Sequence, residues 1–188
     1  MSGEVHQAET GRHVVTLWVF GYGSLLWNPG FEPAEQVLAH LDDYHRSFCM
    51  LSVHHRGTEE EPGLVLALDA RDGASCTGLA LRAKEGEEAE VLAYLRDREL
   101  ISSAYLERHV ELLLIDGRRL AALAYVIDPA HRQYVGFDLE TQAAMIARAV
   151  GGRGPNVEYL HNTAAQLDRL GIHDPDMDWL VARVDEMR

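Results

Sequence analysis

The sequence predicts an α+β fold with a mostly antiparallel sheet, and three observations carry this prediction. Apolar, strand-like segments separated by turn residues fill the first two-thirds of the chain. A single helical pattern, residues 85–98, interrupts them, and helical periodicity dominates from Asp138 onward. Strands followed by a run of helices are typical of α+β proteins, whereas regular alternation would favour a parallel sheet.

The first elements follow from the pattern of apolar residues. Val14–Phe20 is a continuous β-branched and aromatic run, which is typical of a buried strand. A glycine-containing loop, residues 21–30, comes next, and we expect a short helix at Pro33–Leu41. Residues Tyr44–His54 show mixed alternation and are expected to form the second strand.

The next elements are expected to form a hairpin. Residues Arg56–Gly63 are polar, with three consecutive glutamates and a proline, and predict a loop. Gly63–Asp69 alternates apolar and small residues, and Cys76–Arg82 is again strand-like. Because Asp-Gly favours a tight turn, we expect these two segments to pair around Asp72-Gly73.

A helix and a second hairpin follow. Residues Glu85–Arg98 place glutamates early and arginines late, which suits the helix dipole. Val91, Leu92 and Leu95 provide its apolar face. Tyr105–Ile115 and Leu120–Ile127 are strand-like and flank the turn residues 116–119, so we expect them to pair.

Three helices complete the predicted fold. The first helical pattern begins at Asp138, and one of its faces consists of Leu139, Ala143, Ile146 and Val150. We expect Gly151-Gly152 to end that helix. Pro155–Leu170 is the second helix, followed by Gly171, and Pro175–Met187 is the third. The chain shows no linker or repeat, so we expect residues 14–188 to form one domain, with residues 1–13 as a flexible tail.

Composition excludes several classes of protein. The net charge of −13 argues against a nucleic-acid partner, which would require a basic surface. The longest apolar runs, such as Leu120–Ile127, are far shorter than the roughly 20 residues of a membrane-spanning helix. The first ten residues lack the apolar core of a secretion signal. Cys49 and Cys76 are expected to be buried thiols, and we expect a cytoplasmic protein.

The loop after the first strand is the strongest candidate for a binding site. Gly21 and Gly23 allow the main chain to approach a ligand closely, and the loop N–H groups can hold an anion or a developing oxyanion. The third glycine of a dinucleotide-binding loop is absent, because Leu26 takes its place. Leu25 and Leu26 after Ser24 also exclude a Gly-x-Ser-x-Gly elbow. From these residues alone, a structural turn and a binding loop are equally compatible.

The sequence Phe-Gly-Tyr-Gly-Ser-Leu-Leu-Trp-Asn-Pro, residues 20–29, resembles the signature loop of the γ-glutamylcyclotransferase superfamily. Its longer form, with Leu-Trp-Asn-Pro, resembles the ChaC family. Three further stretches agree in order: His55–Thr58 with Pro62-Gly63, Tyr94-Leu95 with Arg98-Glu99, and Gly154–Leu160. The resemblance implies a small closed or partly closed β-barrel surrounded by helices. It also implies cleavage of glutathione to 5-oxoproline and cysteinylglycine, without a metal or cofactor.

This reaction requires few chemical groups. The α-amine of the substrate attacks its own γ-carbonyl carbon, so no external nucleophile is needed. One carboxyl group can first accept a proton and then donate it to the leaving nitrogen. The Tyr-Leu-x-x-Arg-Glu segment resembles the catalytic glutamate segment of the family, which implies that Glu99 is this group. Burial in a pocket would raise its pKa.

The remaining expected contacts are with the substrate. The resemblance implies that the loop holds the γ-glutamyl group, through Phe20, Gly21, Tyr22, Gly23, Ser24 and Leu25. Arg56 could bind a substrate carboxylate, or equally hold the acidic loop 59–61. Tyr105 either contacts the substrate or packs in a strand. For Asn156 and Tyr159, helix capping and packing are favoured over ligand contact.

Other functions stay open. The substrate could be another γ-glutamyl amine or dipeptide, the protein could be a non-catalytic binding or regulatory protein, or water could be admitted to give hydrolysis. The ten histidines show no His-Glu-x-x-His pattern, so no metal site is expected. Nothing in the sequence indicates an oligomeric state.

Overall fold

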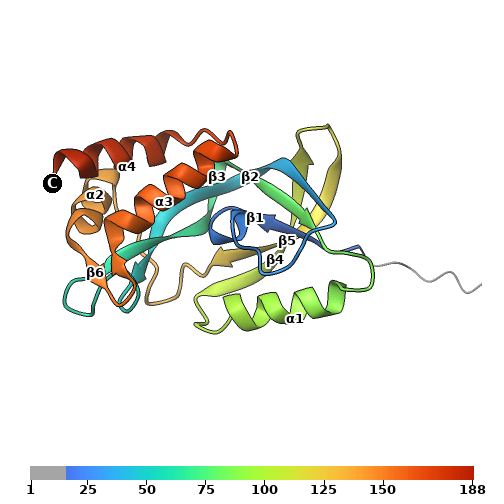
Figure 1. The fold of residues 1–188 in the computed structure, drawn as a ribbon, viewed down its shortest axis with the longest axis horizontal. Coiled ribbons are helices and arrows are strands. Elements are labelled where there is room, and N and C mark those ends of the chain that lie inside the picture. The colour runs from blue at the N-terminus through green and yellow to red at the C-terminus, as the bar shows by residue number, and fades with distance from the viewer. Residues whose placement is uncertain (1–15) are drawn as a thin grey trace, which may run out of the picture.

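The computed structural model describes residues 16–188, and its centre is a closed five-stranded barrel (Figure 1). The strand order is β1-β3-β2-β4-β5, and β5 returns to β1 in a parallel pairing of Val19 with Leu123. The other pairings are antiparallel. These features confirm the predicted α+β class and the expected barrel. The barrel strands are β1 (Trp18–Gly21), β2 (Glu35–Ser52), β3 (Gly63–Arg82), β4 (Tyr105–Leu114) and β5 (Arg119–Ile127).

Four helices cover this sheet. Helix α1 (Glu88–Glu99) packs on the outside of the barrel, beside β1 and β5. Helices α2 (Leu139–Arg148), α3 (Asn156–Arg169) and α4 (Pro175–Glu186) gather at the other end of the molecule, over β2 and β3 (Figure 1). The short elements are the 3₁₀ turn η1 (Ser24–Leu26) and the strands β6 (Val150–Gly151) and β7 (Gly154–Pro155). No helix among residues 16–188 is long and apolar enough to cross a membrane.

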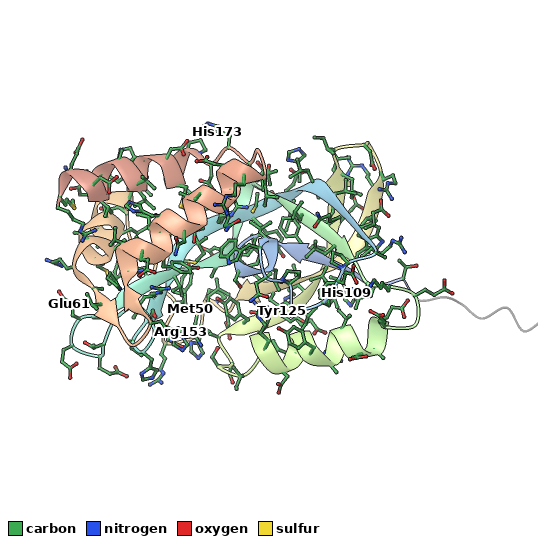
Figure 2. The ribbon with its side chains drawn as sticks, in the orientation of Figure 1. Met50, Glu61, His109, Tyr125, Arg153 and His173 are labelled. Atoms are coloured by element: carbon green, nitrogen blue, oxygen red, sulfur yellow. The ribbon has the colours of Figure 1, made fainter. Side chains whose placement is uncertain are left out.

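Strand β1 is buried on both faces, which explains its unbroken apolar sequence. Successive side chains of a strand point to opposite sides. Phe20 therefore enters the barrel interior, whereas Val19 packs against α1. Side chains fill the space between sheet and helices in Figure 2, where Tyr125 lies inside and Glu61 and His173 lie at the periphery.

The paired strands β2 and β3 are much longer than the barrel needs. Residues 35–42 pair with residues 75–82 inside the barrel, and residues 44–52 pair with residues 63–70 beyond it. The second part provides the apolar surface on which α2, α3 and α4 pack, through Phe48, Leu64 and Leu66. One ladder therefore connects the barrel with the helical layer.

The predicted helix at Pro33–Leu41 is wrong, because these residues begin β2. Ala39 and Leu41 are buried, whereas Gln36 and His40 are exposed. This period of two is the strand period, and it was concealed by the good helix formers in the segment.

The predicted hairpin around Asp72-Gly73 is also wrong. Strand β3 continues from Gly63 to Arg82, and both of its halves pair with β2 rather than with each other. Gly73, at φ 76°, lies opposite Asp43, at φ 63°, where the pairing register shifts. The Gly73 N–H donates to Asp43 Oδ1 at 2.9 Å. The turn residues therefore form an irregularity in a continuous ladder, as in a β-bulge.

The other predicted elements agree closely with the structure. The hairpin of β4 and β5 is confirmed, and α3 and α4 match their predicted bounds to within a residue. Helix α1 begins at Glu88 rather than Glu85, and α2 ends at Arg148, before Val150 enters β6. Cys49 and Cys76 are free and buried, as expected. The predicted tail 1–13 and the first residues of the Val14–Phe20 strand lie outside the described residues, and the single domain 14–188 stays a prediction.

Asn156 joins the helical layer to the sheet. It is fully buried at the start of α3, where Pro155 rather than Asn156 is the capping residue. Its side-chain oxygen accepts from the Leu64 N–H at 2.7 Å, and its amide nitrogen donates to the Leu64 carbonyl at 2.8 Å. The expected capping role is therefore replaced by a paired contact with β3.

Asn156→Ala is expected to lower the free energy of unfolding by about 2–4 kcal/mol, because two buried main-chain groups of Leu64 lose their partners. Chemical denaturation of the purified variant measures this loss. Asn162→Ala, at an exposed position of the same helix, is the matched control and should change stability by less than about 0.5 kcal/mol. Equal losses in the two variants would contradict the assigned role.

Candidate active site

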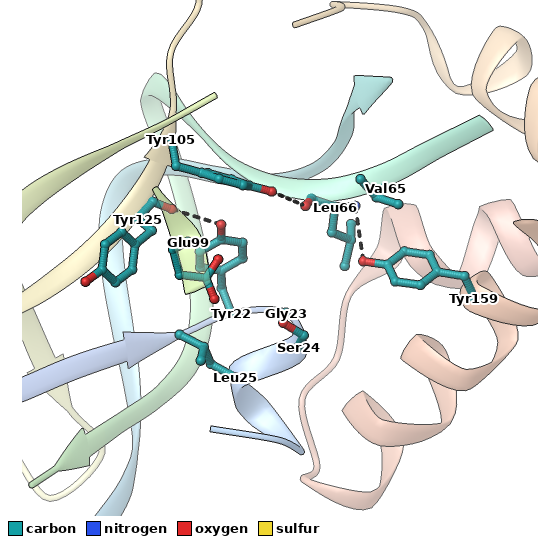
Figure 3. A pocket seen from close by; sticks show the side chains of 10 residues that line it. All are labelled: Tyr22, Gly23, Ser24, Leu25, Val65, Leu66, Glu99, Tyr105, Tyr125 and Tyr159. Carbon is teal, nitrogen blue, oxygen red and sulfur yellow. Dashed lines mark hydrogen bonds between the residues drawn. The ribbon is translucent and has the colours of Figure 1, made fainter. Parts of the chain in front are cut away.

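A cavity of about 160 Å³ lies where the loop after β1 meets the end of α1 (Figure 3). Six parts of the chain contribute to its wall: the loop, β3, the end of α1, β4, β5 and α3. The wall is mainly apolar and phenolic, with one carboxyl group. Its residues are Tyr22, Gly23, Ser24, Leu25, Val65, Leu66, Glu99, Tyr105, Tyr125 and Tyr159.

Glu99 is the last residue of α1, and its carboxyl group projects into this cavity (Figure 3). The side chain is 16% exposed. Its Oε1 atom is buried and accepts no hydrogen bond, and no other buried side-chain polar atom among residues 16–188 lacks a partner. Buried polar atoms are almost always satisfied, so this exception marks a group held for a purpose other than stability.

Two opposing effects act on the Glu99 carboxyl group. Burial raises its pKa above the ordinary value, and the positive charge of Arg98 partly opposes this rise. Arg98 Nε lies 3.1 Å from Glu99 Oε1, but without the alignment of a hydrogen bond. The guanidinium instead donates to Ser24 Oγ at 2.9 Å and to the Asn28 carbonyl at 2.7 Å. Arg98 thus connects the carboxyl group to the loop.

The loop from Tyr22 to Leu25 forms the opposite wall. It turns sharply because the Leu26 N–H donates to the Gly23 carbonyl at 2.9 Å. The Tyr22 hydroxyl donates to the Tyr125 carbonyl at 2.9 Å. Neither the Gly23 nor the Ser24 N–H donates a hydrogen bond within the part of the chain that the structure describes. Unsatisfied donors beside a cavity are available to a ligand.

The tyrosines add no charge to the cavity. The Tyr105 hydroxyl donates to the Leu66 carbonyl at 3.4 Å, and the Tyr159 hydroxyl accepts from the Leu66 N–H at 3.3 Å. Burial raises the pKa of Tyr22, Tyr105 and Tyr159 above that of a free phenol. These hydroxyl groups therefore stay protonated across the physiological pH range.

A second, more open cavity of about 490 Å³ adjoins the first, and both include Ser24, Glu99 and Tyr159 in their walls. Four basic side chains surround it. Arg56 is one of them, with Nη1 3.2 Å from the Pro155 carbonyl and 3.9 Å from Glu158 Oε2. The basic residues are His55, Arg56, Arg98 and Arg153.

The structure brings most of the predicted site residues together. Glu99, Tyr105 and the loop residues Tyr22, Gly23, Ser24 and Leu25 line the first cavity, and Arg56 lines the second. Phe20 and Gly21, which we expected to contact the substrate, line neither cavity. Phe20 is fully buried in the barrel interior, and Gly21 ends β1.

Several lining residues were missed from the sequence. Val65, Leu66 and Tyr125 carry no motif, and they reach the cavity only through the pairing of the strands. Tyr159 belongs to the Gly154–Leu160 stretch, which was the available signal. Among the described residues, no group of three or more His, Cys, Asp or Glu side chains could hold a metal ion.

Comparison with known proteins gives a consistent result. A family model described as ChaC-like protein matches residues 17–187. The glutathione-specific gamma-glutamylcyclotransferase of Escherichia coli strain K12 is 38% identical over 173 residues, 91% of this chain and 74% of that protein. Glutathione-specific gamma-glutamylcyclotransferase 1 of Homo sapiens is 34% identical over 173 residues, 90% of this chain and 77% of that protein.

A solved structure shares the fold. The crystal structure of the yeast γ-glutamyl cyclotransferase specific to glutathione aligns with a TM-score of 0.80, over 92% of this chain and 97% of that chain. The two sequences are 23% identical in this alignment, so the likeness is one of fold.

Glu99→Gln is expected to raise stability in a pH-dependent way. The pKa of Glu99 in the folded state lies above its ordinary value of 4.5. Protonated Glu99 therefore contributes its full stabilisation below pH 4.5, and this contribution is lost as the pH rises through the raised pKa. The uncharged glutamine avoids this loss. At pH values above the raised pKa, the Tm of the variant should therefore exceed that of the wild type. The difference should be roughly 2–4 °C for each kcal/mol by which the free energy of unfolding rises.

Thermal unfolding followed by circular dichroism across this pH range measures the effect. Glu90→Gln, at an exposed position of α1, is the matched control and should show no pH-dependent gain. A Glu99→Gln variant that is less stable than the wild type at every pH would contradict the assigned cost of burial.

Proposed function

The chain belongs to the ChaC family, and from this membership we propose that it cleaves glutathione to 5-oxoproline and cysteinylglycine. The observation that carries the proposal is the buried Glu99 carboxyl group. One of its oxygen atoms accepts no hydrogen bond, and the carboxyl group shares a small cavity with the loop whose Gly23 and Ser24 N–H groups donate none within the described residues. A group that must exchange a proton with a substrate needs this kind of unoccupied oxygen.

In the proposed mechanism, ionised Glu99 accepts a proton from the α-ammonium group of the γ-glutamyl part. The freed amine attacks the γ-carbonyl carbon and closes the five-membered ring. The oxyanion that develops is held by the N–H groups of Gly23 and Ser24. The bond from the γ-carbon to the cysteinyl nitrogen then breaks, and Glu99 returns its proton to this nitrogen. The ring nitrogen still carries two hydrogens after its attack, and it loses one of them through the ionised Glu99 to the departing amine. The products are the lactam of 5-oxoproline and the ammonium form of cysteinylglycine. The substrate supplies both reacting groups, so the enzyme supplies orientation and proton transfer.

The raised pKa of Glu99 suits this double role. A raised pKa brings the carboxyl group closer to the operating pH, which lowers the barrier difference between accepting a proton and releasing it. The neutral phenols and apolar side chains around it keep water from the reacting amine. The burial that raises the pKa therefore also limits the competing attack of water, which would give free glutamate instead of 5-oxoproline.

The two adjoining cavities suit the two parts of glutathione. The smaller cavity holds the γ-glutamyl group, and the larger one holds the cysteinylglycine part, which ends in a carboxylate. The overall charge of −13 repels anions, so capture depends on local donors. The basic side chains around the second cavity, Arg56 among them, provide these donors. We also place the enzyme in the cytoplasm, which agrees with its two free thiols.

Glu99→Gln is expected to lower kcat for glutathione by roughly 10²- to 10⁴-fold, because glutamine keeps the shape of the side chain but cannot transfer a proton. The measurement is the formation of 5-oxoproline and cysteinylglycine by the purified proteins. Glu90→Gln serves as the control and should match the wild type. If the wild type releases glutamate, or forms no product from glutathione, the proposed reaction is wrong. Retained activity in Glu99→Gln would exclude Glu99 as the proton carrier.

Arg56→Met is expected to raise KM for glutathione by roughly 10- to 100-fold, the effect of losing one charge-assisted hydrogen bond, with a much smaller change in kcat. A γ-glutamyl methylamide has no glycine carboxylate, so its KM should be the same for both proteins. Arg169→Met, at an exposed position of α3, is the control variant. An unchanged KM for glutathione in Arg56→Met would show that another group binds the carboxylate.

A further inference from the structure

We infer that Arg46 is a positioning residue for the reaction, because it orients the Tyr22–Gly23 peptide so that the Gly23 N–H faces the cavity. This inference rests on the proposed function and extends it to a residue outside the cavity wall. Arg46 belongs to β2 and lines neither of the two cavities described above.

The guanidinium of Arg46 is enclosed, and each of its three nitrogen atoms donates a hydrogen bond. Its side chain is 3% exposed. Nε donates to the Tyr22 carbonyl at 2.7 Å, Nη1 donates to Asp174 Oδ2 at 2.8 Å, and Nη2 donates to the Thr77 carbonyl. The planar fork therefore connects the loop, strand β3 and the start of α4 in one fixed arrangement.

Stability alone does not explain this arrangement. A buried ion pair gains little over well-packed apolar residues, because both charges must be removed from water. Two of the three acceptors are main-chain carbonyl groups. One of these, the Tyr22 carbonyl, belongs to the loop that faces Glu99. The guanidinium thus holds the Tyr22 carbonyl of the loop in addition to its contacts with Asp174 and the Thr77 carbonyl.

That orientation determines where the next N–H points. A trans peptide is planar, so its C=O and N–H groups point in opposite directions. The described residues contain no cis peptide bond. With the Tyr22 carbonyl held against Arg46, the Gly23 N–H points away from Arg46. Gly23 lines the cavity, and its N–H donates no hydrogen bond within residues 16–188. A Cβ atom added to Gly23 would meet nothing within 4 Å, so its main chain is open to a ligand on that side.

Tyr22 is held at both ends. Its hydroxyl donates to the Tyr125 carbonyl of β5, while its own carbonyl accepts from Arg46 of β2. The side chain is therefore fixed independently of the main chain. Rotation of the Tyr22–Gly23 peptide would leave the ring in place and would break only the bond to Arg46. This makes Arg46 the group that decides the peptide orientation.

Asp174 completes the arrangement. Its Oδ1 caps α4 by accepting from the Met177 N–H at 3.1 Å, and its Oδ2 pairs with Arg46. Asp138 caps α2 in the same way, by accepting from the Thr141 N–H at 2.8 Å, but it has no arginine partner among the described residues. The chain therefore contains a matched pair of capping aspartates, of which one is connected to the loop.

The test is Arg46→Lys in the full chain. Lysine keeps the positive charge beside Asp174 but lacks the Nε donor, so the Tyr22 carbonyl loses its partner. We expect kcat for glutathione to fall by roughly 10- to 100-fold, somewhat less than the loss of a whole oxyanion donor. KM should change less than threefold, and the acid limb of the kcat–pH profile should stay in place, because Glu99 is untouched. A general loss of structure in the variant would instead change kcat, KM and the acid limb of the kcat–pH profile together.

Three matched variants distinguish the contact of Arg46 with the loop from the general effect of replacing an arginine or of removing a charge from a helix cap. Arg82→Lys alters another arginine of the barrel. Its Nε atom lies 3.3 Å from Glu35 Oε2, and neither residue belongs to the loop, so this variant should keep kcat within twofold. Asp174→Asn keeps a good capping residue but removes the charge, and should lower kcat several-fold. Asp138→Asn should leave kcat unchanged.

A crystal structure of Arg46→Lys provides a readout that does not depend on activity, and we expect the Tyr22 carbonyl to have turned away from residue 46. An unmoved Tyr22 carbonyl, or a kcat within twofold of the wild type, would overturn the inference. If the wild type forms no 5-oxoproline, the proposed function fails instead. The orientation of the Tyr22–Gly23 peptide in the crystal then decides the role of Arg46 by itself.

Discussion

The pairing of β2 with β3 is the interaction on which the rest of the structure depends. One end of this ladder belongs to the barrel, and the other end supports three helices. The irregularity at Asp43 and Gly73, where the register shifts, separates the two ends. The candidate site lies between the two regions, because Leu66 comes from the helical end and Tyr125 from the barrel. Without the extra length of these strands, the cavity would have no wall on the side of α3.

The site combines two features that are unfavourable in isolation. A carboxyl oxygen is buried without a hydrogen bond, and the N–H groups of Gly23 and Ser24, two residues of the cavity wall, donate none within residues 16–188. A substrate with an ammonium group and a polarised carbonyl satisfies both at once. The cost of these unsatisfied groups is offset by the surrounding core, in which the barrel interior and the helical layer form separate apolar clusters. Stability elsewhere in the fold therefore makes an unstable arrangement possible at one point.

The class of fold and the glycine loop could be predicted because each has a local signal. Glu99 was singled out by the resemblance of its Tyr-Leu-x-x-Arg-Glu segment to the family, and its catalytic role stays a prediction. The continuous apolar run before Gly21 and the charge gradient of α1 are properties of neighbouring residues. The strand at residues 35–41 was mistaken for a helix because its alternation becomes meaningful only when β3 lies beside it. Tyr125 and Leu66 could not be assigned to the site for the same reason. Phe20 lies within the signature stretch, but the alternation of β1 turns it into the barrel.

The bond between Arg46 and Asp174 has a consequence for the order of folding. It joins residues that are 128 positions apart, whereas the β2–β3 and β4–β5 pairings connect neighbours in the chain. Local pairings form early because they close short loops, and contacts of large sequence separation form late. The β2–β3 and β4–β5 hairpins can therefore form before two long-range events, the closure of the barrel through Val19 and Leu123 and the docking of α4, which brings Asp174 to the guanidinium. A chain at that stage contains every residue of the site, but it acquires a working loop only in these later steps.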